Sequence, residues 1–183
     1  ATLSGLDQDN YKLSSVSNAT ADISPKSASV SPVASSKVYG TVDPAFSGTA
    51  VGFLEADGIT VNYVRLPGEQ VAGYVINGVL SPGNALGNYD ITYNTAQFEI
   101  TKAKLVVVAD NKSKVYGDLN PGFTGIMEGV VATDEIVATY SSAATESSPV
   151  QTYPITISLD GAALSNYDIE LTAGILTITQ RPI

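Results

Sequence analysis

The sequence predicts a mainly-β protein made of tandem small domains, with an immunoglobulin-like sandwich as the expected fold of each. Short segments in which apolar and polar residues alternate follow one another along the chain, as in half-buried strands. Gly, Asn and Pro punctuate the intervals between these segments, which is typical of turns. A long interval of sequence also repeats, which indicates consecutive copies of one domain.

The repeat is visible as two motifs with nearly constant spacing. The pairs Asn10-Tyr11, Asn88-Tyr89 and Asn166-Tyr167 follow one another at equal intervals, and a second motif, Tyr-Gly-x-x-x-Pro-x-Phe-x-Gly, recurs at almost the same interval. Its copies consist of Tyr39, Gly40, Pro44, Phe46 and Gly48, and of Tyr116, Gly117, Pro121, Phe123 and Gly125.

This spacing divides the chain into a first repeat at 27–102, a second at 103–180 and the start of another at 181–183. Residues 1–26 match only the last part of a repeat. Two interpretations of this segment stay open. It consists either of the C-terminal strands of a preceding repeat or of a permuted part of the first domain.

The elements of the second repeat follow from local patterns. The β-branched run at 105–108 predicts an opening strand, and alternation predicts strands at 136–140, 151–159, 167–172 and 176–179. The interval 129–136 fits either one helical turn or a tight loop. A β-grasp with one short helix per repeat is therefore the alternative fold.

The first repeat follows the same pattern with one departure. Its opening segment contains Pro32, which predicts an edge strand or a short one. Almost no linker separates the repeats, because the last apolar segment of the first copy runs directly into the opening strand of the second. This junction favours an extended, semi-stiff rod.

Composition narrows the class of protein. The 183 residues are 44% hydrophobic and only 15% charged, which is typical of a folded chain. No apolar run approaches the length of a membrane span. The net charge is −9 and the nine basic residues do not cluster, so nucleic acid is not an expected partner.

The chain contains no His and no Cys. Serine and cysteine triads, histidine zinc sites and disulfides are therefore excluded. A pair of carboxylates could still hydrolyse a glycoside, but Asp57 and Asp134 recur without an acidic partner that recurs with them. We expect no enzymatic activity, no catalytic residues and no organic cofactor.

The Tyr-Gly pairs are expected to be structural rather than platforms for a ligand. Tyr39 and Tyr116 are predicted to pack in the core, while Gly40 and Gly117 permit a turn with positive φ.

The Asn-Tyr pairs receive a similar interpretation. Tyr89 and Tyr167 begin alternating segments and are predicted to face inward. Asn88 and Asn166 are predicted to be turn residues in a left-handed conformation.

Calcium is the candidate cofactor, since oxygen ligands on loops suit this ion. The candidate ligands are Asp7, Asp9, Asp110 and Asp118, although no complete calcium-loop motif is present. An internal isopeptide bond is a further hypothesis. Lys37 and Lys114 recur at the interval of the repeat and would react with Asn88 and Asn166, but that chemistry needs a buried carboxylate that the sequence does not identify.

With these motifs in order and repeated, the chain resembles the MBG domain family of the YGX type, as two copies over about residues 27–180. Residues 1–26 resemble the end of a related YDG or MBG repeat. The resemblance implies a module of large secreted or surface-anchored bacterial proteins, including adhesins. It brings no catalytic residues with it.

The expected function is therefore that of an extracellular spacer repeat on the bacterial cell surface, projecting a distal binding region, with neighbouring repeats of the same chain as its partners. The alternative is a repeat that itself binds a host glycan or surface protein. The loops that differ most between the copies, 65–69 and 141–150, would then supply the binding surface.

Overall fold

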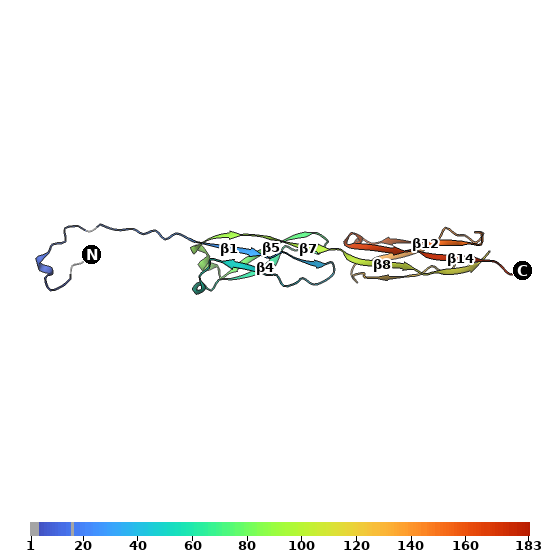
Figure 1. Ribbon diagram of the computed structural model, residues 1–183, viewed down its shortest axis with the longest axis horizontal. Coiled ribbons are helices and arrows are strands. Elements are labelled where there is room, and N and C mark those ends of the chain that lie inside the picture. Colours follow the sequence, from blue (N-terminus) through green and yellow to red (C-terminus); the bar gives the residue numbers. More distant parts are fainter. Residues whose placement is uncertain (1–3, 16) are drawn as a thin grey trace.

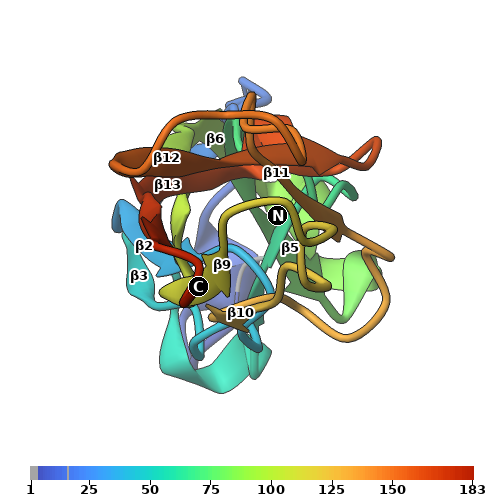
Figure 2. The same ribbon diagram turned by 90° about the vertical axis from the view of Figure 1, so that its right-hand side faces the viewer.

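The computed structural model describes residues 4–15 and 17–183. Two β domains lie end to end along one axis, and their strands run along that axis (Figure 1). Viewed from the C-terminal end, one domain lies behind the other (Figure 2). The prediction of tandem, mainly-β domains is confirmed.

The first domain alternates short strands with tight connections. Its elements are β1 (Lys26–Pro32), β2 (Ser35–Val38), β3 (Gly48–Val51), a 3-10 turn (Glu55–Asp57), β4 (Thr60–Arg65), β5 (Gly73–Ser81), a 3-10 helix (Gly83–Asn88), β6 (Tyr89–Tyr93) and β7 (Ala96–Thr101). They form a three-stranded sheet in the order β3-β1-β6 and a four-stranded sheet in the order β2-β7-β5-β4.

The second domain repeats this topology. Its elements are β8 (Ala103–Ala109), β9 (Lys112–Val115), β10 (Gly125–Glu128), β11 (Val137–Ser141), β12 (Thr152–Asp160), a 3-10 turn (Leu164–Asn166), β13 (Tyr167–Thr172) and β14 (Gly174–Thr179). The sheets have the orders β10-β8-β13 and β11-β12-β14-β9. Each domain is thus a small two-sheet sandwich. The interval 129–136 of the second repeat forms a turn, whereas the equivalent interval of the first repeat contains the 3-10 turn Glu55–Asp57. The two sheets of each repeat favour the sandwich over the β-grasp.

The predicted effect of Pro32 on the opening strand is wrong. β1 is the central strand of its sheet, paired with β3 on one side and β6 on the other. Pro32 is the last residue of β1 and lies opposite Gly48. At the end of a strand, a missing N–H group interrupts little of the hydrogen-bond ladder.

The segment before Lys26 lies apart from both domains. Residues 4–15 and 17–25 are exposed, and the one regular element among them is a 3-10 helix at Gln8–Asn10. The segment extends away from the first domain along the long axis (Figure 1). Residues 1–3 and 16 of the predicted segment 1–26 lie outside the described residues, and its assignment to a preceding repeat or to the first domain stays a prediction.

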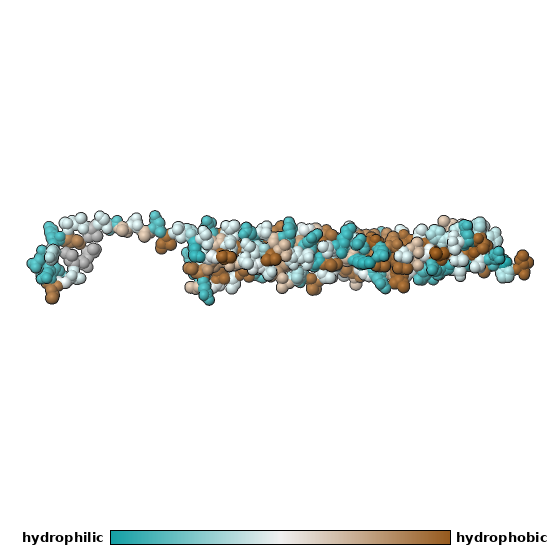
Figure 3. Space-filling view, in the orientation of Figure 1, coloured by the Kyte–Doolittle hydropathy of each residue, from teal (hydrophilic) through white to brown (hydrophobic). Residues whose placement is uncertain are grey.

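Polar and apolar residues are interspersed along the outside of the two domains (Figure 3). Strand alternation explains this pattern: in β14, Leu176 and Ile178 are buried while Thr177 between them is exposed, because successive side chains point to opposite faces. Among the described residues, no helix has the length and apolarity needed to cross a membrane.

Candidate functional site

The larger of the two buried hydrophobic clusters includes residues of both repeats. β7 ends at Thr101 and β8 begins at Ala103, so Lys102 alone separates them. One continuous buried cluster crosses this boundary. It contains Tyr39, Ile76, Phe98 and Ile100 from the first repeat and Ala103, Leu105, Val107, Ile136 and Tyr167 from the second. The two repeats therefore share a hydrophobic core.

Two tyrosines, one from each repeat, lie at the centre of this boundary. The rings of Tyr39 and Tyr167 pack edge to face with their centroids 5.6 Å apart, a favourable arrangement for aromatic rings. The hydroxyl of Tyr39 donates to Oδ1 of Asp134 at 2.9 Å, and the hydroxyl of Tyr167 donates to the other oxygen of the same carboxylate. Asp134 thus accepts one hydrogen bond across the boundary, from Tyr39, and one from Tyr167 of its own repeat, and so connects the two tyrosines.

The Tyr167 hydroxyl also accepts a hydrogen bond from the Val131 backbone N–H at 2.9 Å. Burial, and then the hydrogen bond to Asp134, raises the pKa of Tyr167 to about 12. The same two causes raise the pKa of Tyr39. Both phenols therefore keep the proton that they donate to Asp134 up to strongly alkaline pH.

Asn166 makes a second polar connection. It ends the 3-10 turn before β13 and is 2% exposed. Its Oδ1 accepts from the Val71 backbone N–H at 3.0 Å, and its Nδ2 donates to Oε1 of Gln70 at 2.9 Å. Both partners belong to the first repeat, so this buried amide is satisfied across the boundary.

Gly40 allows the close approach of the two repeats. Its φ is +79°, a conformation that glycine adopts without strain. A Cβ at this position would overlap Cγ2 of Val131 in the second repeat. The prediction of positive φ holds for Gly40 and also for Gly117, at +85°, and at Gly40 the second repeat also leaves no room for a side chain.

Counterparts of the junction residues lie at the two outer ends of the pair of repeats. At the start of the first repeat, the Tyr89 hydroxyl donates to Asp57 and accepts from the Leu54 N–H at 2.9 Å. The hydrogen bond to Asp57, and then burial, raises the pKa of Tyr89. Asn88 is exposed there, whereas its counterpart Asn166 is buried at the junction.

At the end of the second repeat, Tyr116 is 43% exposed. The prediction that Tyr116 packs in the core is therefore wrong, because this side chain lies at the end face of its own repeat. The inward orientation predicted for Tyr89 and Tyr167 agrees with exposures of 8% and 2%.

The left-handed conformation predicted for Asn88 and Asn166 is also wrong. Among the described residues other than glycine, positive φ occurs at Glu135. Asn88 and Asn166 instead end 3-10 turns, directly before β6 and β13.

A network of four charged side chains lies at the junction end of the first repeat. Lys37, whose side chain is 5% exposed, lies 2.7 Å from Asp43 Oδ1 and 2.5 Å from Glu69 Oε2. Arg65 bridges the same two carboxylates at 2.6 and 2.5 Å. Hydrogen bonds from Arg65 hold the pKa of Asp43 below its ordinary value, and those from Lys37 and Arg65 do the same for Glu69.

In the second repeat, neutral backbone carbonyl groups take the place of the carboxylates as partners of the lysine. Lys114, the counterpart of Lys37, donates to the carbonyl oxygens of Asp118 and Thr145 at 3.0 and 2.7 Å. Asn120 stands where the first repeat has Asp43, and donates to the Ala144 carbonyl oxygen at 2.6 Å. One buried lysine is thus balanced by carboxylates and the other by backbone carbonyl groups.

The remaining residues of the Tyr-Gly motif pack within their own repeats. Phe46 packs edge to face on Phe98, with centroids 5.3 Å apart, and Phe123 packs against the second buried cluster, formed by Ala109, Ala144, Ile155, Leu176 and Ile178. Gly48 and Gly125 leave space for tyrosine rings, since a Cβ at either would lie within 2.6 Å of the ring of Tyr63 or Tyr140. Pro44 and Pro121 lie in the connections β2–β3 and β9–β10.

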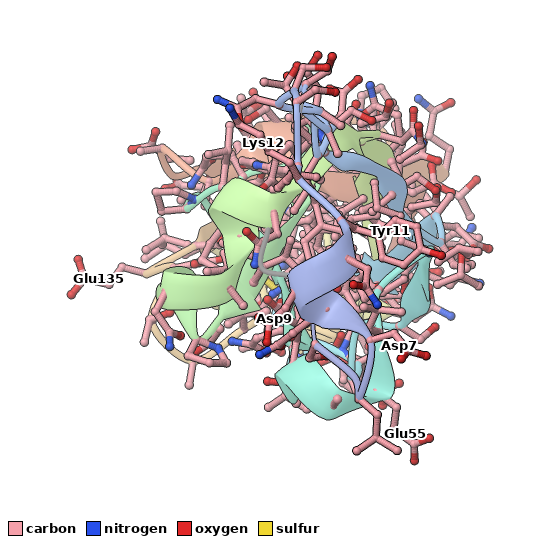
Figure 4. The ribbon with its side chains drawn as sticks, turned by 90° about the vertical axis from the view of Figure 1, so that its left-hand side faces the viewer. Asp7, Asp9, Tyr11, Lys12, Glu55 and Glu135 are labelled. Atoms are coloured by element: carbon pink, nitrogen blue, oxygen red, sulfur yellow. The ribbon has the colours of Figure 1, made fainter. Side chains whose placement is uncertain are left out.

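The four candidate calcium ligands lie on separate parts of the molecule. Asp7 and Asp9 are on the exposed amino-terminal segment (Figure 4). Asp110 accepts from Thr124 Oγ1 at 2.5 Å and lies 3.5 Å from Lys112, and Asp118 pairs with Arg181. Within residues 4–15 and 17–183, no group of three or more acidic, His or Cys side chains is placed to share a metal ion.

The candidate crosslinking residues are likewise apart. Lys37 is paired with Asp43 and Glu69, and Lys114 with backbone carbonyl groups. Asn166 is hydrogen-bonded to Gln70 and Val71. Neither lysine has Asn88 or Asn166 among its partners.

The two variable loops differ in how they are held. In the loop 65–69, Arg65 donates to the carbonyl oxygens of Leu66 and Gly68 at 3.0 and 2.6 Å, in addition to its ion pairs. The loop 141–150 is mostly exposed. Together with Leu119 and Asn120 it borders a shallow hollow lined by Thr145, Glu146 and Ser147.

Comparison with known families decides the classification. The family described as MBG domain (YGX type) matches residues 28–99 and 105–177. The chain belongs to the MBG domain family. The two matched segments coincide with the two sandwiches, so each sandwich is one MBG repeat. No curated protein matches the chain.

The sequence contains one signal for the junction between the MBG repeats. Asp57 and Asp134 recur at the interval of the repeat, and as candidates for carboxylate chemistry they have no acidic partner. Their partners are instead tyrosines, which recur in the same two repeats. The roles of Gln70 and Val71 have no such signal in the sequence.

Proposed function

We propose that these MBG repeats are spacer modules of a large bacterial surface or secreted adhesin, and that they hold a distal binding region away from the cell. The observation that carries this proposal is the shared core at the junction. A single residue links the repeats, and aromatic packing, a bridging carboxylate and a buried amide join them. Such a junction resists bending and twisting.

The surface is consistent with this role. A net charge of −9 on 183 residues keeps an extended protein soluble and limits non-specific adhesion. The extracellular location, the bacterial origin and the adhesin context are part of the proposal, and they rest on the composition and on the kind of protein in which MBG repeats are expected.

Small-angle X-ray scattering of the purified chain tests the proposal. A compact particle of this length would have a radius of gyration of about 16 Å, whereas the end-to-end arrangement should give a value well above about 20 Å. The value should stay the same when calcium is added and when it is chelated. A compact particle, or one that extends only with calcium, would contradict a rigid spacer held by the junction alone.

A further inference from the structure

The two strands that open each repeat pair in parallel with the two strands that close it, one pair in each sheet. In the first repeat, β1 pairs with β6 over Lys26–Val30, and β2 pairs with β7 over Ser35–Val38. In the second repeat, β8 pairs with β13 and β9 pairs with β14 in the same sense. The opening and closing segments of each repeat therefore run in the same direction along the rod and are hydrogen-bonded to each other in both sheets, and the strands lie along the long axis (Figure 1).

This arrangement determines how a pull on the chain ends acts on each repeat. The entering strand is drawn toward one end of the rod and the leaving strand toward the other. The hydrogen bonds of a parallel pair are evenly spaced and slant across from one strand to the other, so the pull shears them. All the bonds of a pair must then yield together, whereas strands pulled apart from one end lose their bonds one at a time.

We propose that each repeat is a mechanical clamp, and that these repeats carry tension as well as spanning distance. This inference rests on the spacer role proposed above, because only a chain held at both ends is loaded in this way. The clamp consists of the parallel pairs β1·β6 and β2·β7 in the first repeat and β8·β13 and β9·β14 in the second.

Additional bonds extend the clamp at its C-terminal edge in both repeats. The Tyr39 N–H donates to the Thr101 carbonyl oxygen at 2.9 Å, and the Thr101 hydroxyl donates to the Lys37 carbonyl oxygen at 3.2 Å. In the second repeat the equivalent bonds join Tyr116 to Thr179 at 2.9 Å and Thr179 to Lys114 at 3.3 Å.

The clamp strands also supply much of the hydrophobic core. Phe98 and Ile100 on β7, and Leu176 and Ile178 on β14, are at most 2% exposed. Sliding these strands would expose these side chains to water together with the hydrogen bonds. Since Lys102 alone separates β7 from β8, tension passes from one clamp to the next without a slack linker.

Single-molecule force spectroscopy with two attachment geometries tests the clamp. The chain has no cysteine, so handles can be attached at introduced ones. Ser24→Cys with Ile183→Cys loads the clamps along the strands, whereas Leu119→Cys with Ile183→Cys pulls β9 and β14 apart from one end. Positions 24, 119 and 183 are exposed and lie outside the strands. At one loading rate, we expect a several-fold higher unfolding force in the first geometry, with one event per repeat.

A matched pair of variants locates the resistance. Leu176 on β14 and Ile155 on β12 are both fully buried in the same cluster, so their truncation to alanine should reduce equilibrium stability similarly. With end-to-end pulling, Leu176→Ala should lower the unfolding force of its repeat more than Ile155→Ala does. β14 receives the pull directly, whereas β12 does not.

Equal forces in the two geometries, or a larger effect of Ile155→Ala, would overturn the clamp. These outcomes are distinct from a failure of the spacer role, which scattering measures without force. A chain that scatters as a rod but unfolds equally easily in both geometries would be a spacer without a clamp. A bent or compact chain would remove the spacer role itself.

Discussion

Tyr39 and Tyr116 occupy the same position in two copies of one motif, yet Tyr39 is 9% exposed and Tyr116 is 43% exposed. The backbone is the same in both, since the following glycine has φ of +79° in one copy and +85° in the other. The difference lies in what covers the ring. A second repeat covers Tyr39 and presents Tyr167 and Asp134 to it.

The comparison shows that this tyrosine belongs to the junction more than to the core of its own repeat. The same holds for Asn166, which is buried at the junction while Asn88 is exposed at the outer end. Each engaged residue thus has an unengaged counterpart in the same chain, and these pairs provide internal controls for mutation.

The largest difference should come from the tyrosines. Tyr39→Ala removes a buried aromatic ring and the hydroxyl bound to Asp134, and should destabilise the protein by about 3–5 kcal/mol. Tyr116→Ala should change the free energy of unfolding by about 1 kcal/mol or less. Urea unfolding of both variants measures this. Equal losses of unfolding free energy in the two variants would show that the contacts of Tyr39 across the junction do not stabilise the protein.

The bridging carboxylate should come next. Asp134→Ala leaves two buried hydroxyl groups without an acceptor, which should cost about 2–5 kcal/mol. Asp57→Ala removes the acceptor of one tyrosine and should have a smaller effect. In addition, the pKa of Tyr167 should fall from about 12 toward its ordinary value in Asp134→Asn, measured by absorbance of the phenolate. An unchanged pKa of Tyr167 would show that the hydrogen bond to Asp134 does not contribute to its raised value.

The asparagines should show a smaller effect. Asn166→Ala removes two hydrogen bonds across the boundary and leaves the Val71 N–H without its acceptor, which should cost about 1–3 kcal/mol. Asn88→Ala should stay within about 0.5 kcal/mol. Hydrogen exchange of the Val71 amide provides a local readout. If that amide remains as protected in Asn166→Ala as in the parent chain, its protection does not depend on the hydrogen bond to Asn166.

The smallest expected effect is a difference between the two repeats in how their stability depends on pH. The pKa values of Asp43 and Glu69 are lowered by hydrogen bonds from Arg65 and Lys37. Their contribution to stability is therefore present above the unfolded pKa values, near 4, and is lost as the pH falls through the lower folded values. Below about pH 4 the first repeat should lose stability that the second, with Asn120 in place of Asp43, does not.

Urea unfolding of Asp43→Asn between pH 7 and pH 2 measures this effect. The variant should be less stable than the parent at pH 7 and show a flatter dependence on pH in acid. If the variant and the parent lose stability in parallel, the network does not set the acid sensitivity.

Much of the fold could be predicted from local pattern. The alternation at 151–159 and 176–179 corresponds to β12 and β14, because a half-buried strand imposes a period of two on its sequence. The position of Pro32 could not be predicted in this way. Whether a strand is central or at an edge depends on partners that are distant in the chain, and β1 pairs with β3 and β6.

The junction was harder to predict for a related reason. Tyr39 and Tyr116 share the same local motif, and only the neighbouring repeat makes one of them buried. The recurrence of Asp57 and Asp134 with Tyr89 and Tyr167 was visible in the sequence. Its meaning required knowing that each aspartate faces a tyrosine of its own repeat and that Asp134 also faces one of the preceding repeat.

The buried cluster that crosses the junction also affects how the chain folds. When each repeat contacts only its neighbours, total stability is approximately a sum of repeat terms and nearest-neighbour terms. Here the neighbour term includes part of the core itself. A repeat should therefore fold more readily beside one that is already folded, and order should spread along the array from repeat to repeat, as it does in a one-dimensional lattice.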